Sequence, residues 1–330
     1  GAARGGAARA APGPRRVARR QARLGDVEVV KHLRLPVWPA WFGIFYILLD
    51  FVTGDPKLGA RLEDWLGGRV CPMTYSDPAE ADPYLLVVHH RHSFNVLDPL
   101  RYLFRSVLMP EGFPAHPHRG FETVTYVLRG GLVHRDSFGI KKSYGAPPDS
   151  DGSGDHAAVQ WMTAGRGLRH EEMWRTGGAW DSTDQELFQI WVNLPASAKM
   201  VPPRMQMLRE PSEQEQKDAE GEAPGVGGGV RVDELGPVPK AQPGPGVTVR
   251  VVAGEACGVR SPVETHSELA ILHVTLEPGA SWSWPRPQGW TCLAYMRRGE
   301  GAVNGGDVPV HHTATVSRAN GGLALEAGPE

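Results

Sequence analysis

Cysteine is scarce in this sequence, and neither sign of charge dominates it. The 330 residues include three cysteines, Cys71, Cys257 and Cys292, which lie far apart and are odd in number. A disulfide scaffold and a zinc site built from cysteines are therefore excluded as organising features. Thirty-five Lys and Arg against 37 Asp and Glu give a net charge of -2. Because there is no overall basic field, we expect no direct binding of nucleic acid.

Long apolar runs are also missing. The most apolar stretch, residues 37–52 (VWPAWFGIFYILLDFV), contains Pro39 and Asp50. It is shorter than the ~20 residues that a membrane-spanning helix needs. We expect a helix that packs on the core, within an apolar helical extension over residues 37–81. Contact of residues 37–52 with a membrane surface is the alternative.

Glycine and proline, in contrast, are abundant. The 41 Gly and 29 Pro together make up more than a fifth of the chain, which favours many short strands with tight turns and disfavours a helical bundle. Hydrophobic residues account for 41% and charged residues for 22%. This balance can bury a core and excludes wholesale disorder, and the length predicts about two domains.

The N-terminal segment has a composition of its own. Residues 1–36 are rich in Arg, Ala and Gly, and no acidic residue precedes Asp26. Such a composition is typical of organelle transit peptides, although these are usually rich in serine and the first serine here is Ser76. We expect residues 1–36 to be an address for a chloroplast or mitochondrion, or alternatively a disordered basic tail.

From residue 82 onward, short runs of β-branched and aromatic residues alternate with glycine-bearing turns. This spacing predicts an all-β fold of two antiparallel domains, each a small barrel or a sandwich, preceded by a short helical or extended N-terminal extension. We place the first barrel at residues 82–205, a Gly/Pro-rich linker at 206–246 and the second barrel at 247–330. The predicted strands of the first barrel include Tyr84–Val88, Glu122–Leu128, Val159–Met162 and Leu187–Val192.

Two short motifs place metal-ligating side chains on one side of a strand. The sequence H-P-H (116–118) precedes a predicted strand, and H-E-E (170–172) follows a Gly-rich turn. Residues two apart on extended backbone point to the same face. If the two motifs are neighbours in a barrel, three imidazoles and one carboxylate converge, a set that suits Fe, Mn, Ni, Cu or Zn. The predicted ligands are His116, His118, His170 and Glu172.

Alternatives remain for each part of this site. An isolated H-x-H is often a pair of surface histidines without a metal, and Glu171 replaces Glu172 as the ligand if the backbone bulges. Glu122 can accept a hydrogen bond from an imidazole or compete as a ligand. His134, beside Asp136, is most simply interpreted as part of a strand-end ion pair.

Two further segments are candidates for a role near the site. The histidine patch at 89–92 (HHRH) is a conceivable second metal site, but it has no further ligand nearby in the sequence. Residues 143–156 (SYGAPPDSDGSGDH) show no strand pattern, and long loops near a site can act as lids. We therefore expect this loop to narrow the mouth of the site or to close over the substrate.

Three longer stretches resemble the pirin family of the cupin superfamily. They are HPHRGFETVTYVLRGGLVHRDSFG (116–139), VQWMTAGRGLRHEEM (159–173) and WVNLPASAKM (191–200). The resemblance covers roughly residues 82–325. It implies two cupin barrels of the jelly-roll type, with Fe(II) in the first and no metal in the second. The iron ligands that it implies are again His116, His118, His170 and Glu172.

The second barrel and the chain end depart from the first barrel and from the family pattern. Where the first barrel has H-P-H, residues 282–287 (WSWPRP) hold no imidazole or carboxylate. His311 and His312 are adjacent, so they face opposite sides of a strand. The chain ends at Glu330, before the tail that in pirins packs back on the first domain, and we expect a truncated second barrel.

The resemblance implies two roles. One is 2,3-dioxygenation of quercetin-like flavonols with O₂, in which Glu172 takes the hydroxyl proton of the substrate. The other is redox-sensing, iron-dependent binding of transcription regulators, in the cytoplasm or nucleus. A metal-bearing remnant without activity is the third alternative. The sequence does not separate them, because all three need the same four ligands.

Overall fold

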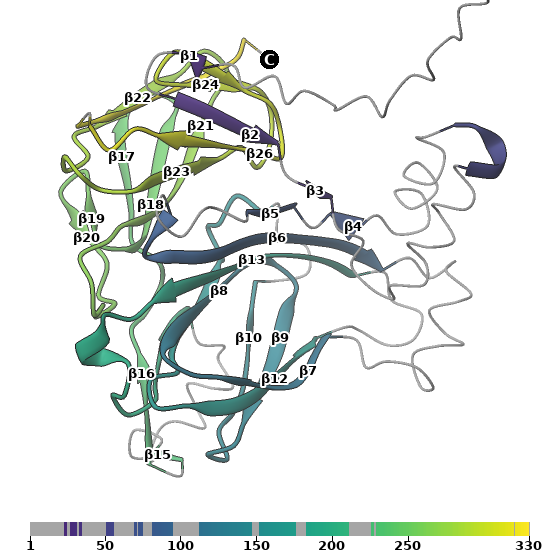
Figure 1. Cartoon of the computed structure of the whole chain (residues 1–330), viewed down its shortest axis with the longest axis vertical. Coiled ribbons are helices and arrows are strands. Elements are labelled where there is room, and N and C mark those ends of the chain that lie inside the picture. The colour runs from purple at the N-terminus through teal and green to yellow at the C-terminus, as the bar shows by residue number, and fades with distance from the viewer. Residues whose placement is uncertain are drawn as a thin grey trace, which may run out of the picture.

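The structure is a computed structural model. It describes residues 51–55, 81–94, 112–146, 152–175, 183–210, 226–227, 229–319 and 321–329, together with the backbone of short strands at 23–24, 27–31, 33–34, 69–70 and 72–74. Among these residues the regular secondary structure is almost entirely strand, with a helical turn at 51–53 and the 3-10 helix η1 (Ala196–Ala198). The all-β prediction is confirmed (Figure 1).

Strands of the first barrel come mainly from the middle of the chain. They are β6 (Tyr84–Phe94), β7 (Gly112–His118), β8 (Phe121–Arg129), β9 (Gly131–Asp136), β10 (Lys141–Gly145), β11 (Ala158–Thr163), β12 (Leu168–Trp174), β13 (Thr183–Asn193), β14 (Arg204–Leu208), β15 (Val226–Gly227) and β16 (Val230–Glu234). The short strands β3 (Leu33–Arg34), β4 (Arg69–Val70) and β5 (Pro72–Thr74) join them.

The second barrel uses the C-terminal part of the chain and a strand pair from its beginning. Its strands are β1 (Arg23–Leu24), β2 (Val27–Lys31), β17 (Lys240–Gly244), β18 (Val247–Ala253), β19 (Glu255–Ala256), β20 (Val259–Arg260), β21 (Ile271–Leu276), β22 (Ser281–Trp284), β23 (Cys292–Tyr295), β24 (Gly301–Val303), β25 (Gly306–Val308), β26 (His312–Val316) and β27 (Leu323–Ala327). Its interior is a cluster of buried aliphatic residues with Trp282.

Two facing sheets enclose the interior of the first barrel. One has the strand order β10-β9-β12-β7, and the other runs β15-β16-β14-β11-β8-β13-β6-β5-β3, with β4 also paired to β6. Val127, Leu132, Tyr144 and Leu187 are buried in one cluster that draws on both sheets. Apolar packing fills this part of the barrel, and the hydroxyl group of Tyr144 reaches the polar residues described below.

Alternation along β8 gives each face of the larger sheet its own core. Val124, Tyr126 and Leu128 pack with Val252 and Leu269 of the second barrel. The intervening residues point into the first barrel. Figure 1 shows the resulting arrangement, with the green and yellow strands of the second barrel stacked on the blue and teal strands of the first. The two barrels therefore share a continuous hydrophobic interface.

The predicted linker at 206–246 contains strands. β14 continues to Leu208, β16 pairs with it in parallel, and β17 pairs with β18. The prediction failed here because high Gly and Pro content masks short strands: Val230 and Val232 are buried, while the proline-bearing β17 lies at a sheet edge where a missing N–H is tolerated. Residues 211–225 lie outside the described residues.

The N-terminal predictions are corrected in part. Within residues 1–36, predicted as an address or a disordered tail, β2 pairs with β26 along its whole length. Within 37–81, predicted as helical, β4 and β5 are strands, because they are paired with β6. Residues 37–50, for which membrane contact is the alternative, lie outside the described residues. Where the structure describes the chain, no helix has the length and apolarity to cross a membrane.

Candidate metal centre

The two predicted ligand motifs lie on adjacent antiparallel strands. His170 in β12 is directly opposite His116 in β7, and Leu168 is opposite His118. Paired residues of neighbouring strands point to the same face, so the three histidine side chains enter the barrel together. The structure thus brings together three of the four predicted ligands, with suitable nitrogens within 4.8 Å of one another.

A glycine turn fixes the start of β12. Gly165 has a φ of +50°, and a Cβ at this position would collide with the backbone carbonyl oxygen of Val201. That oxygen is held in place by the amide of Arg166 at 2.9 Å, and the amide of Gly120 donates to the Gly165 carbonyl at 2.8 Å. The turns that follow β7 and β11 are therefore tied together, and the two histidine strands are kept in register.

The imidazole nitrogens that face each other are free to bind a cation. Nδ1–H of His116 donates to the Pro114 carbonyl oxygen at 2.7 Å, which leaves Nε2 with a lone pair. This nitrogen lies 3.1 Å from Nε2 of His170. Nε2 of His118 is buried without a hydrogen-bond partner among the described residues. An orphaned buried nitrogen beside two others is an arrangement that a metal ion satisfies.

Burial keeps two of these rings neutral. It lowers the pKa of His118 to about 3, with a further contribution from the neighbouring His170. Burial also lowers the pKa of His170 to about 3, helped by His134 and His116. Neutral imidazole is the form that binds metals, so the site is prepared for a cation at neutral pH without prior loss of a proton.

Glu172 is completely buried and held by three donors. Its Oε1 accepts hydrogen bonds from Tyr144 Oη at 2.8 Å and Thr125 Oγ1 at 3.0 Å, and its Oε2 accepts one from Gln189 Nε2 at 3.0 Å. Burial, followed by the nearby carboxylate, raises the pKa of Tyr144 well above its usual value. A second cluster of possible metal ligands consists of His134, His170 and Glu172. Glu172 is not part of the first cluster, which the three predicted histidines form.

The alternative Glu171 faces outward. Its carboxylate accepts from Arg135 at 2.7 Å in a pair whose side chains are both solvent-accessible. The register does shift between His170 and Glu172, but the extra residue lies in β7, because His170 is opposite His116 whereas Glu172 is opposite Phe113. Alternation in β12 is therefore undisturbed, and the i+2 residue stays inside.

His134 and Asp136 belong to the site, which the sequence interpretation missed. Oδ2 of Asp136 lies 3.3 Å from Nε2 of His134, and Nδ1 of His134 lies 3.3 Å from Nδ1 of His170. Burial alone raises the pKa of Asp136, but hydrogen bonds from His134 and from the amides of Ile140 and Phe138 lower it on balance. The missed signal was H-x-D on a strand, which places both side chains on one face just as H-x-H does.

Glu122 does not contact the histidines. It accepts a hydrogen bond from Thr163 Oγ1 at 2.6 Å, on the other face of the larger sheet. Counting four residues from His118 placed it on the wrong face, because the turn at 119–120 interrupts the strand and resets the alternation. Thr125 and Gln189 of this sheet point into the barrel instead and reach Glu172.

Alternation along β6 divides the histidine patch: the ring of His90 contacts Phe113 and Trp174 in the first barrel, whereas His89 lies at the junction between the barrels. Nε2–H of His89 donates to Glu186 at 2.9 Å, and its ring stacks on Phe188. Arg297 of the second barrel donates twice to Glu186, at 2.7 Å each. Burial tends to raise the pKa of Glu186, but the hydrogen bonds from His89 and Arg297 hold it well below its usual range. His89 thus serves an ion network.

The segment predicted as a lid, residues 143–156, begins inside strand β10, where Tyr144 donates to Glu172 at 2.8 Å. Gly145, the last residue of β10, is opposite Gly131, whereas Asp136 at the far end of β9 is the residue opposite His170. Near the end of the segment, Asp155 pairs with Arg250 at 2.6 Å and Lys240 at 2.9 Å in the second barrel. Residues 147–151 of the loop lie outside the described residues, so its action as a lid stays a prediction.

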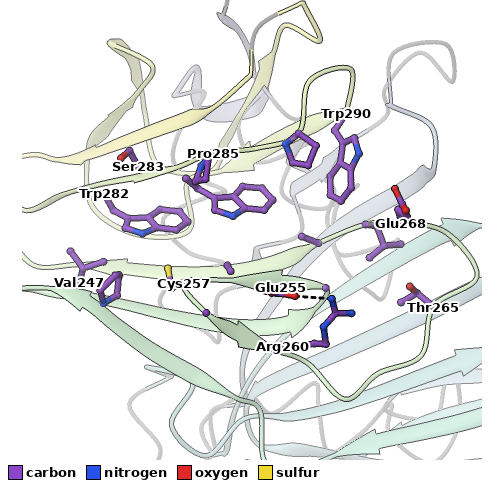
Figure 2. A pocket seen from close by; sticks show the side chains of 18 of the residues that line it. Val247, Glu255, Cys257, Arg260, Thr265, Glu268, Trp282, Ser283, Pro285 and Trp290 are labelled. Carbon is purple, nitrogen blue, oxygen red and sulfur yellow. Dashed lines mark hydrogen bonds and ion pairs between the residues drawn. The ribbon is translucent and has the colours of Figure 1, made fainter.

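A hollow of about 1120 Å³ lies on the second barrel and shares no residue with the histidine cluster. Figure 2 shows Trp282, Pro285 and Trp290 along one side of it and Glu255, paired with Arg260, along the other. Tryptophan rings replace the imidazoles that the first barrel has inside. His266 and Glu268 also line the hollow.

Two packed β-barrels, one of them with histidines and a glutamate clustered inside, define a protein of the cupin class. The family model described as Pirin matches residues 78–192. Over 265 residues the chain is 34% identical to Pirin-1 of Arabidopsis thaliana, an alignment that covers 78% of this chain and 71% of that protein. The chain belongs to the pirin family.

Two other proteins extend this similarity. Pirin-like protein 2 of Arabidopsis thaliana is 36% identical over 245 residues, covering 71% of this chain, and the chain spans 62% of that protein's length. The crystal structure of quercetin 2,3-dioxygenase from Acinetobacter baumannii is 27% identical, with a TM-score of 0.58, and the match covers 80% of this chain and 78% of that one.

Proposed function

We propose that the protein is a metal-dependent dioxygenase that uses Fe(II) and O₂ to cleave flavonol-type substrates. The observation that carries the proposal is the convergence of three imidazoles beside a buried carboxylate inside the first barrel. The similarity to a quercetin 2,3-dioxygenase supports the substrate class. The ligands in this proposal are His116, His118, His170 and Glu172.

When bound, Fe(II) supplies redox chemistry toward O₂ and a positive charge that favours the ionised enol of the substrate. The chain itself supplies the proton acceptor. Glu172 takes the enol proton on its carboxylate, which the donors Tyr144, Thr125 and Gln189 hold in one orientation. An oriented base is more effective than a mobile one, because no reorganisation is needed when the proton moves.

Burial around the cluster indicates how a substrate approaches. His118 and His170 are buried, whereas His116 is only half-buried, so the cluster meets solvent on the His116 side. The ring centroids of Phe121 and Trp191 lie 4.9 Å apart. The centroid of the His118 ring lies 5.0 Å from that of Phe121 and 5.4 Å from that of Trp191. This aromatic wall offers a flat phenolic substrate a surface for stacking beside the ligands.

Turnover of quercetin tests the proposal. Chain loaded with Fe(II) under anaerobic conditions should consume O₂ and bleach the flavonol absorbance when air is admitted. Glu172→Gln should lower the rate by about 100-fold or more, the usual worth of a positioned base. Glu171→Gln is the matched control, because it changes the neighbouring residue and disturbs only the solvent-accessible pair with Arg135.

Iron content is measured in each variant to separate loss of the base from loss of the metal. If iron-saturated wild type neither consumes O₂ nor changes the quercetin spectrum, the enzyme proposal fails. Iron-dependent binding of a protein partner then becomes the better account of the same site.

A further inference from the structure

A buried chain of hydrogen bonds leads from a carboxylate to the metal-facing nitrogen of His170. Asp136 and His134 lie two residues apart in β9, beside β12. Oδ2 of Asp136 is 3.3 Å from Nε2 of His134, and Nδ1 of His134 is 3.3 Å from Nδ1 of His170. The side chains of His134 and Asp136 are 0% and 1% exposed, so water does not compete for these contacts.

The direction of each hydrogen bond follows from the carboxylate. Oδ1 of Asp136 already accepts from the amides of Phe138 at 2.9 Å and Ile140 at 3.1 Å, and an ionised carboxylate only accepts. Nε2 of His134 therefore carries the hydrogen, and in the neutral ring Nδ1 is the acceptor. The donor to that nitrogen is Nδ1–H of His170, which leaves Nε2 of His170 with a lone pair.

We propose that Asp136 and His134 are positioning residues that select the tautomer of His170 and so present its bare Nε2 to the metal. The inference rests on the metal site of the proposed function and adds two residues to it. His116 also has a bare Nε2, but there the tautomer is fixed by the hydrogen bond from Nδ1–H to the Pro114 carbonyl oxygen. Groups behind a ligating histidine commonly fix its ring and tautomer in this way.

The geometry also defines a competing account. His134, His170 and Glu172 have possible ligand atoms within 4.8 Å of one another, so His134 can act as a ligand of a second ion. In that case His134 itself binds metal through Nδ1, and each chain binds two ions. The number of ions per chain therefore separates a positioning role from a ligating role.

Asp136→Asn is the decisive variant. Its Oδ1 is kept as an oxygen by the two backbone amides, so the new NH₂ group takes the place of Oδ2 and donates to Nε2 of His134. This substitution reverses the hydrogen-bond chain with almost no change in shape, and it places a hydrogen on the metal-facing Nε2 of His170. His134→Leu removes the acceptor, and His134→Gln, whose amide oxygen can accept from His170, is the rescue control.

Metal affinity is measured with Co(II) in competition with a chromophoric chelator. Asp136→Asn and His134→Leu should bind about 10- to 100-fold more weakly than wild type, and His134→Gln should stay within about fivefold of it. Circular dichroism and the urea midpoint show that each variant is folded. Equal affinity in wild type and folded Asp136→Asn overturns the proposal, as does binding of two ions by wild type and one by His134→Leu.

Imidazole ¹⁵N NMR of the metal-free chain gives a readout independent of the metal. His170 should be protonated on Nδ1 in wild type and on Nε2 in Asp136→Asn. The same tautomer in both overturns the proposal even if wild type binds Co(II) tightly. Failure of wild type to bind any ion would instead refute the proposed function, and the NMR comparison would still decide the tautomer.

Discussion

Buried histidines make the metal-free chain sensitive to acid. Burial lowers the pKa of His90, His118 and His170 to about 3 in each case. The unfolded chain, with the ordinary histidine pKa of about 6.5, therefore binds more protons than the folded chain below that pH. Each such histidine lowers the free energy of unfolding by up to about 1.4 kcal/mol per pH unit as the pH falls below 6.5.

The urea midpoint of the metal-free chain should accordingly fall steadily between pH 6.5 and pH 5, a window in which ordinary carboxylates contribute little. His90→Gln replaces one of these groups, outside the predicted ligands, with a side chain that does not titrate. Its slope against pH should be shallower than that of wild type. A wild-type midpoint that does not change over this window would show that the histidines are protonated within the fold.

Residue-level prediction from the sequence succeeded where a strand is regular and failed where a turn intervenes. Alternation correctly put Glu172 inside and Glu171 outside, because β12 has no inserted residue. It misplaced Glu122, because the turn at 119–120 lies between it and His118. The role of His134 depends on strand β9 lying next to β12, which no local pattern in the sequence reveals.

At the scale of elements, the turn between β11 and β12 holds the ligand strand in place. Gly165→Ala adds a methyl group to a residue with a positive φ, and this group collides with the fixed carbonyl oxygen of Val201. We expect a loss of stability of at least about 3 kcal/mol, together with weaker metal binding, because β12 must shift. Denaturant unfolding and Co(II) titration measure the two effects.

Gly139→Ala is the matched control for this substitution. Gly139 also has a positive φ, of +82°, but a Cβ there has nothing within 4 Å. The free energy of unfolding of this variant should fall by only about 1–2 kcal/mol, the cost of a positive φ for a residue with a Cβ, and its affinity for metal should be unchanged. Equal losses in the two variants would show that the contact with Val201 is readily relieved.

Strand positions were predictable for the long apolar runs and not for the short polar ones. β8, β11 and β13 coincide with runs of β-branched and aromatic residues, since both of their faces are buried. β16 and β17 were taken for a linker because their sequences carry charge, glycine or proline, and only pairing with β14 and β18 makes them strands. Local composition does not encode such long-range pairing.

At the scale of the whole molecule, the N-terminal strands complete the second barrel. β2 is hydrogen-bonded along β26, and β1 pairs with β2. Deleting residues 1–36 should leave one side of β26 unpaired and lower the melting temperature by roughly 5 °C or more, since about 1 kcal/mol moves Tm by ~2–8 °C in domains of this size range. The exposed edge should also promote self-association.

Deletion of residues 1–22 is the control, because every strand pair described above lies after it. Calorimetry and size-exclusion chromatography of the two truncations provide the comparison. Equal melting temperatures would mean that β1 and β2 contribute nothing to stability. If deletion of residues 1–36 lowers the melting temperature and these residues also serve as an organelle address, any cleavage during import must leave β2 attached to the protein.

The pairing of β2 with β26 sets an order of events during synthesis. β2 (Val27–Lys31) is synthesised well before β26 (His312–Val316). At a translation rate of about 5–20 residues per second, β2 exists for tens of seconds before its partner β26 has been synthesised. The first barrel can close around its histidines during that wait. Metal capture can therefore precede completion of the second barrel, and the unpaired early strand is the segment that a chaperone has most time to bind.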